Sequence, residues 1–102
     1  MANLNMFSCL FLLLLCFNIC KGDWCIVKYT VSNVVKKSFI ESACSKLDCS
    51  AIKPGGPCYE PDTLTNHASY VLNLDYRKNK VCREEIGTIA LTDPSYDNCR
   101  YT

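Results

Sequence analysis

The 102-residue chain carries 11 Lys and Arg against 10 Asp and Glu, a net charge of +1 at neutral pH. This balance argues against nucleic-acid binding and against docking on anionic membranes, since both require a surplus of basic side chains. The main compositional feature is the number of cysteines, which is nine.

Residues 1–22 are predicted to form a secretory leader. The apolar run at 6–17 is long enough for the core of a signal peptide but too short to span a bilayer comfortably. Small side chains at Cys20 and Gly22 fit the positions that precede a cut after Gly22. We therefore expect a mature domain over residues 23–102, with an uncleaved anchor or a buried helix as the alternative for the apolar run.

Removing the leader takes Cys9, Cys16 and Cys20 with it and leaves an even set of cysteines. Such a set, spread over a short exported domain, is typical of a disulfide framework. A domain of this size buries little apolar surface, so covalent links would supply part of its stability. The remaining cysteines are Cys25, Cys44, Cys49, Cys58, Cys82 and Cys99. Their spacing alone leaves the pairing open.

The first predicted elements are a strand and a helix. The apolar, partly β-branched run at 24–27 predicts an edge strand pinned by its cysteine. Ser32 is a favourable N-cap, and the apolar spacing after it predicts a helix over about residues 32–45. The side chains expected on its buried face are Val35, Phe39, Ile40, Ala43 and Cys44. The side chains expected to face water are Lys36, Lys37 and Glu41.

A loop, a second helix and a second strand follow. Proline and glycine at 52–58 predict a fixed loop. A helix is predicted over about residues 63–78, with Asp62 as its cap. The β-branched run at 87–92 precedes a turn signal at 93–95 and predicts a short strand. The expected fold class is α+β, with two helices packed on a small antiparallel sheet and loops held by disulfides.

Short blocks around the cysteines form a specific pattern. These blocks are Trp24-Cys25, Ala43-Cys44, Asp48-Cys49-Ser50-Ala51-Ile52-Lys53-Pro54-Gly55-Gly56-Pro57-Cys58-Tyr59, Pro61-Asp62-Thr63, His67-Ala68-Ser69-Tyr70 and Asp93-Pro94-Ser95-Tyr96 with Cys99. Together they resemble carbohydrate-binding module family 43, the plant X8 domain, over essentially all of residues 23–102. With a leader and a single module, the chain resembles the stand-alone members of the olive-pollen-allergen type.

The resemblance implies secreted, non-catalytic binding of β-1,3-glucan, the callose of plant cell walls. It also implies that Cys25 pairs with Cys82, Cys44 with Cys49, and Cys58 with Cys99. We accordingly expect a monomer in the cell wall or apoplast, with no cofactor, no metal, no nucleic-acid partner and no stable membrane anchor. Hydrolysis is not expected, because it usually needs two carboxylates facing each other across a cleft, whereas adjacent carboxylates such as Glu84 and Glu85 point to opposite sides of an extended chain.

One stretch departs from the family pattern. Members usually carry an aromatic residue two positions after the fifth cysteine, where this chain has Arg83-Glu84-Glu85-Ile86. If that aromatic side chain lines the sugar groove, the ligand preference would change; if it lies in the core, only packing would. The departure motivates an alternative function, a disulfide-stapled secreted protein that acts in defence or binds other proteins without binding sugar.

A sugar site needs aromatic faces for the C–H patches of pyranose rings and planar polar groups for their hydroxyls. The candidate carbohydrate-binding residues are Tyr59, Asp62, Asn66, Tyr70, Asn73 and Tyr96. The alternative for each tyrosine is a ring packed in the core, and Asp62 could serve only as a helix cap. Trp24 is expected in the core, and the lone His67 is expected to be a hydrogen-bonded structural residue rather than a metal ligand or a base.

Overall fold

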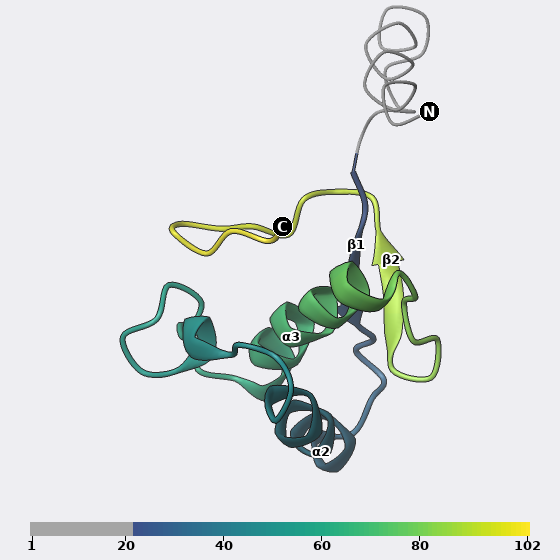
Figure 1. The fold of residues 1–102 in the computed structure, drawn as a ribbon, viewed down its shortest axis with the longest axis horizontal. Coiled ribbons are helices and arrows are strands. Elements are labelled where there is room, and N and C mark those ends of the chain that lie inside the picture. Colours follow the sequence, from purple (N-terminus) through teal and green to yellow (C-terminus); the bar gives the residue numbers. More distant parts are fainter. Residues whose placement is uncertain (1–21) are drawn as a thin grey trace, which may run out of the picture.

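The computed structural model describes residues 22–102, so the predicted leader lies outside the described residues except for Gly22. The elements in chain order are β1 (Trp24–Val27), α2 (Asn33–Cys44), the 3-10 helix η2 (Ser50–Ile52), α3 (Leu64–Asn79) and β2 (Gly87–Ala90). Figure 1 shows α3 in the middle of the domain, with the two strands on one side of it and α2 on the other. The predicted α+β class is confirmed. No helix among residues 22–102 is both long enough and apolar enough to cross a membrane.

The sheet consists of β1 and β2, which pair antiparallel with Trp24 opposite Ala90 and Val27 opposite Gly87. A side chain on Gly87 would overlap Leu72 Cδ2 and the sulfur of Cys25, so glycine allows β2 to lie close to α3. The second strand ends at Ala90, short of the predicted 92.

Both helices begin at side-chain caps. Ser32 Oγ accepts the backbone N–H of Val35, as predicted for α2. The cap of α3 is Thr63, whose Oγ1 accepts the backbone N–H of Asn66 at 3.1 Å, so the prediction of Asp62 as the cap was wrong by one residue. The helix ends where Lys80 adopts a left-handed conformation with φ 65° and its N–H bonds back to Tyr76.

The buried face of α3 supplies the centre of the core. Ala68, Val71 and Leu72 are fully buried and contribute to two apolar clusters, one toward β1 and β2 and one toward η2 and the C-terminal segment. Trp24 is half-buried against the second of these clusters. Core packing therefore fixes α3 relative to every other element.

The exposed and buried faces of α2 differ from the prediction at two positions. Lys36 is buried, and its ammonium donates to Thr65 Oγ1 at 2.8 Å, which ties α2 to the first turn of α3. Val35, expected in the core, is 43% exposed. A long aliphatic stem lets Lys36 cover apolar surface while its charged end reaches a polar partner.

Three disulfides cross-link the described domain, Cys25–Cys82, Cys44–Cys49 and Cys58–Cys99. The pairing implied by the family resemblance is thereby confirmed. The first joins β1 to the segment before β2, the second closes the turn after α2, and the third joins the loop before α3 to the C-terminal segment.

Candidate functional site

Two loops far apart in sequence meet at one end of the domain. The loop after η2 and the C-terminal segment lie on the same side of α3 in Figure 1, and the Cys58–Cys99 disulfide joins them. Within the C-terminal segment, Tyr96 and Cys99 exchange backbone hydrogen bonds of 3.0 and 2.8 Å. The two loops therefore form one cross-linked unit.

The loop after η2 depends on a close approach of its backbone. A side chain at Gly56 would overlap the carbonyl oxygens of Ser50 and Ala51, so the loop lies directly on η2 only with glycine there. The N–H of Cys58 donates to Ala51 O at 2.8 Å and fixes the same contact. The Pro-Gly-Gly-Pro sequence thus positions Tyr59 immediately after it.

An open groove of about 530 Å³ runs between these loops. Its lining residues are Gly55, Gly56, Pro57, Tyr59, Glu60, Tyr96, Asp97 and Asn98. The lining combines two tyrosine rings with carboxylates and an amide, and it includes no Lys or Arg. This set suits a ligand rich in hydroxyl groups better than an anion.

Tyr59 is held from both ends. Its hydroxyl donates to Asp62 at 2.8 Å, and its ring lies against the imidazole of His67 with centroids 5.6 Å apart. The hydrogen bond to Asp62 raises the pKa of Tyr59, because ionisation would remove the donated proton beside a carboxylate. His67 Nε2 lies 2.7 Å from the carbonyl oxygen of Tyr59 and must donate to it, which confirms the structural role predicted for this histidine.

Tyr96 is held by the turn before α3. The single proton of its hydroxyl is shared between the backbone oxygen of Glu60, at 2.6 Å, and Asn66 Oδ1, at 3.0 Å. The amide nitrogen of Asn66 in turn donates to the carbonyls of Cys58 and Pro61 at 3.1 Å each. A single side chain on the first turn of α3 thus connects both walls of the groove.

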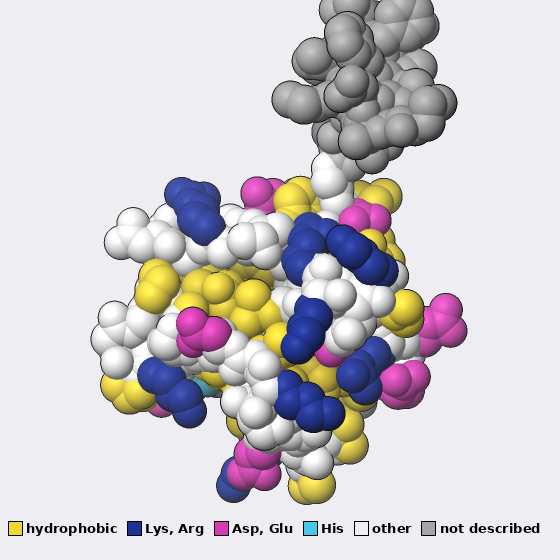
Figure 2. Space-filling model, in the orientation of Figure 1, with side chains coloured by type: hydrophobic (Ala, Val, Ile, Leu, Met, Phe, Trp, Pro, Cys, Tyr) yellow, Lys and Arg dark blue, Asp and Glu magenta, His cyan; other side chains and the backbone are white. Residues whose placement is uncertain are grey.

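Tyr70 lies one turn further along α3 than Asn66 and does not line this groove. Its half-buried ring meets Tyr101 edge to face, with centroids 5.4 Å apart. Burial, followed by the charge of Asp48, raises the pKa of Tyr70. Tyr70 packs against the same core cluster as Leu47 and Ala51, which are also partly buried. Figure 2 shows hydrophobic side chains gathered between the C-terminal segment and the loop around η2.

Asn73 lies away from the groove. It is only 1% exposed, its Oδ1 accepts the backbone N–H of Cys25 at 3.1 Å, and its amide donates to the carbonyl of Thr102 at 3.0 Å. These bonds connect β1 to the C-terminal segment through α3. Asn73 therefore has a structural role, because it cross-links three segments of the fold.

Four of the candidate residues therefore come together, with Tyr59 and Tyr96 in the groove and Asp62 and Asn66 behind them. Sequence reasoning missed Asp97 and Asn98 as lining residues. Their signal is the Asp97-Asn98 pair itself, two residue types that favour turns, placed between Tyr96 and Cys99. Among residues 22–102, no group of His, Cys, Asp and Glu is arranged to hold a metal ion.

Comparison with known proteins identifies one family, and the relatives described here are plant proteins. The family profile described as the X8 domain matches residues 23–85. A glucan endo-1,3-beta-D-glucosidase of Olea europaea is 40% identical over 86 residues, which are 78% of this chain and 19% of that protein. Plasmodesmata callose-binding protein 2 of Arabidopsis thaliana is 31% identical over 78% of this chain and 44% of its own length. The major pollen allergen Ole e 10 of Olea europaea is 34% identical over 76% of this chain and 69% of its own.

The glucosidases and the pollen allergen match this chain to different extents of their own length. The chain spans less than a fifth of each of the first glucosidases it matches, so these share one module with it. It covers more than two thirds of the pollen allergen. The family match also extends over more than half of this chain. The chain therefore belongs to the X8 domain family.

Proposed function

We propose that this protein binds β-1,3-glucan without cleaving it, through the groove between the loop after η2 and the C-terminal segment. The observation that carries the proposal is the pair of tyrosines, Tyr59 and Tyr96, in a groove whose lining includes no Lys or Arg. Their rings offer faces for sugar C–H groups, and Glu60, Asp97 and Asn98 offer acceptors and donors for hydroxyls. The name of the callose-binding relative supports a β-1,3-glucan as the ligand.

The groove is held in shape before any ligand arrives. Asp62 and Asn66 hold the two tyrosine hydroxyls, and the Cys58–Cys99 disulfide fixes the loops on which both rings stand. A preformed site loses little conformational freedom on binding, which favours affinity for a flexible polysaccharide. Tyr70 is only partly buried against the same core cluster as Tyr96, which supports a role for its ring at a further sugar unit.

A binding role without catalysis is supported by how the glucosidase relatives align. Those proteins match this chain over less than a fifth of their length, so most of each enzyme lies outside the shared module. The open groove also differs from the enclosed cleft in which a hydrolase holds two opposed carboxylates.

The disulfides support a location outside the cell. Every cysteine among residues 22–102 is paired, and such bridges persist in oxidising compartments. We place the mature domain in the cell wall or apoplast, delivered there by the leader over residues 1–22.

Titration with laminarin, a soluble β-1,3-glucan, tests the proposal. The oxidised protein should show saturable shifts of the amide resonances of Tyr59, Tyr96 and Asn98. Tyr59→Ala should weaken binding about tenfold or more, because one stacked aromatic platform is removed from the sugar. Its control is Tyr29→Ala, since Tyr29 is 92% exposed and lies outside the groove.

Two results would overturn the proposal. One is the absence of any shift in the groove at millimolar laminarin. The other is equal weakening by Tyr59→Ala and Tyr29→Ala, which would show that the groove does not recognise the sugar. Hydrolysis products in the laminarin sample would contradict the non-catalytic part.

A further inference from the structure

A second cavity lies between the C-terminal ends of the two helices. It has a volume of about 290 Å³, at the small end of ligand pockets, which span about 300 to 1,000 Å³. Its lining residues are Phe39, Ser42, Ala43, Lys46, Leu47, Asp75, Lys78, Asn79 and Arg83. None of these lines the glucan groove, so the two sites are separate.

A buried carboxylate orients one cation at the cavity. Asp75 accepts Arg83 Nε at 3.0 Å and a terminal guanidinium nitrogen at 3.4 Å, and it also accepts the amide of Asn79 at 2.8 Å. The Asp75 side chain is 7% exposed and that of Arg83 is 50% exposed. Arg83 therefore stands in a fixed position at the rim while half of its surface remains open to a ligand.

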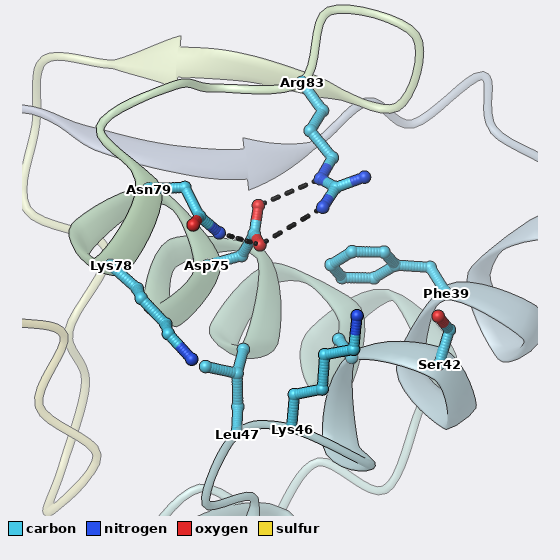
Figure 3. Close-up of a pocket in the computed structure, with 9 residues that line it drawn as sticks. Phe39, Ser42, Lys46, Leu47, Asp75, Lys78, Asn79 and Arg83 are labelled. Carbon is cyan, nitrogen blue, oxygen red and sulfur yellow. Dashed lines mark hydrogen bonds and ion pairs between the residues drawn. The ribbon is translucent and has the colours of Figure 1, made fainter.

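The remaining cations give the lining of the cavity a net positive charge. Figure 3 shows Lys46 extending toward Phe39 from the side opposite Arg83, and Lys78 extending from the helix that carries Asp75 toward Leu47. With three cations and one carboxylate, the lining carries a net charge of +2. The ion pairs formed within residues 22–102 do not include either lysine. Two uncompensated ammonium groups beside a half-open guanidinium favour a carboxylate, which binds such donors through charge-assisted hydrogen bonds.

The walls between the cations are apolar. Phe39 is half-buried, and Figure 3 shows its ring beneath the guanidinium of Arg83, with the guanidinium carbon 6.0 Å from the ring centroid. Leu47 lines the cavity as well. An aromatic ring next to cations suits a ligand that has both a C–H face and an anionic group, which an inorganic anion does not have.

We propose that this cavity binds a saccharide that carries a carboxylate, namely a uronate unit. Lys46, Lys78 and Arg83 would hold the carboxylate, and the ring of Phe39 would lie against the sugar. This function goes beyond neutral glucan binding and uses residues that do not line the glucan groove. It also gives a use to Arg83, the first residue of the stretch where the chain departs from the family pattern.

Titration of the oxidised protein with trigalacturonate at an ionic strength of about 0.1 M tests this proposal, since charges farther apart than about 10 Å are largely screened under that condition. Laminaritriose, a neutral sugar of equal length, and inorganic phosphate serve as separate arms. Trigalacturonate should shift the amide resonances of Phe39, Lys46 and Asn79, and laminaritriose should leave them in place. The double variant Lys46→Gln/Lys78→Gln should bind trigalacturonate about tenfold more weakly, since two exposed charge contacts are removed.

The matched control is Lys37→Gln/Lys53→Gln, which removes the same charge from exposed positions outside the cavity. It should keep trigalacturonate affinity within about twofold, because exposed charges at a distance are screened. Equal weakening of trigalacturonate binding in both double variants would mean that only the net charge of the protein matters, and it would overturn the proposal. So would unmoved cavity resonances, or phosphate binding as tightly as trigalacturonate, which indicates a site for any anion. Laminarin binding is followed through the amide resonances of Tyr59 and Tyr96, which do not line this cavity. The glucan proposal and the uronate proposal can therefore be contradicted independently of each other.

Discussion

The hydroxyl of Tyr96 lies 3.0 Å from Asn66 Oδ1, across a sequence separation of 30 residues. Through this contact the C-terminal segment rests on the first turn of α3. Asn66 also holds the carbonyls of Cys58 and Pro61, so it fixes both loops of the glucan groove at once. The groove geometry thus depends on a polar side chain that does not itself line the groove.

Tyr96→Phe should weaken laminarin binding while leaving the aromatic ring in place. The change removes the hydroxyl that bonds Glu60 and Asn66, so the C-terminal segment should move more freely relative to the loop after η2. We expect a stability loss of about 1 to 2 kcal/mol, because the amide oxygen of Asn66 loses its partner. Urea denaturation and laminarin titration measure the two effects. Tyr29→Phe is the control, and equal losses in both variants would contradict the role given to the Tyr96 hydroxyl.

Gly56→Ala should destabilise the domain more than Gly55→Ala. The added methyl group at position 56 would overlap the carbonyl oxygens of Ser50 and Ala51, so the loop must move away from η2. At Gly55 the space is open and only the backbone, with φ +89°, resists a side chain. We expect about 1 kcal/mol at position 55 and about 2 to 4 kcal/mol at position 56. Denaturant midpoints of the two variants decide the order, and the reverse order would disprove the close contact with η2.

Local sequence signals predicted the framework of the fold. Ser32 and the apolar spacing after it predict α2, and the cap-type residue Asp62 predicts a helix that begins within one residue of the observed start of α3. These signals act within a few residues of each other, so they can be read without knowing the tertiary fold. The disulfide pairing came only from the family resemblance, because spacing leaves it open.

Contacts between distant segments could not be read in this way. Lys36 is buried because Thr65, on the other helix, accepts its ammonium. Asn73 is a candidate sugar-binding residue in the sequence, yet it is buried, because its side-chain amide bonds the backbones of Cys25 and Thr102. Asp62 and Thr63 are both favourable cap residues. The carboxylate of Asp62 accepts the hydroxyl of Tyr59, and Thr63 caps the helix. Each difference arises from a partner that periodicity does not reveal.

The long disulfide beneath the groove should matter more for stability than the short one after α2. Cys58–Cys99 closes a loop with a sequence separation of 41, and Cys44–Cys49 one of 5. On the chain-entropy model, replacing each pair by alanine should cost about 4 and about 2 kcal/mol, respectively. The comparison requires Cys58→Ala/Cys99→Ala and Cys44→Ala/Cys49→Ala in the same denaturation assay. Laminarin binding should be lost only in the Cys58→Ala/Cys99→Ala variant. If that variant still binds laminarin, the shape of the groove does not depend on the Cys58–Cys99 disulfide.

Alkaline pH should destabilise the domain through Tyr101. Burial, together with the hydroxyls of Tyr96 and Tyr70, raises the pKa of Tyr101 well above its ordinary value, and the residue is 9% exposed. In the unfolded chain this tyrosine ionises near a pH of about 10. Above that pH the unfolded state releases a proton that the folded state keeps, so the free energy of unfolding falls as pH rises. The loss from Tyr101 approaches about 1.4 kcal/mol per pH unit.

Urea denaturation between pH 8 and pH 11.5 measures this slope, and Tyr101→Phe separates the contribution of Tyr101 from the rest. The variant should retain a smaller slope, because burial also raises the pKa of Tyr70 and Tyr76. Tyr29→Phe, at a position 92% exposed, should leave the slope of the original protein unchanged. Identical slopes for the protein and Tyr101→Phe would mean that the Tyr101 hydroxyl reaches solvent. In that case the edge-to-face contact between Tyr101 and Tyr70 would not exclude water from the Tyr101 hydroxyl.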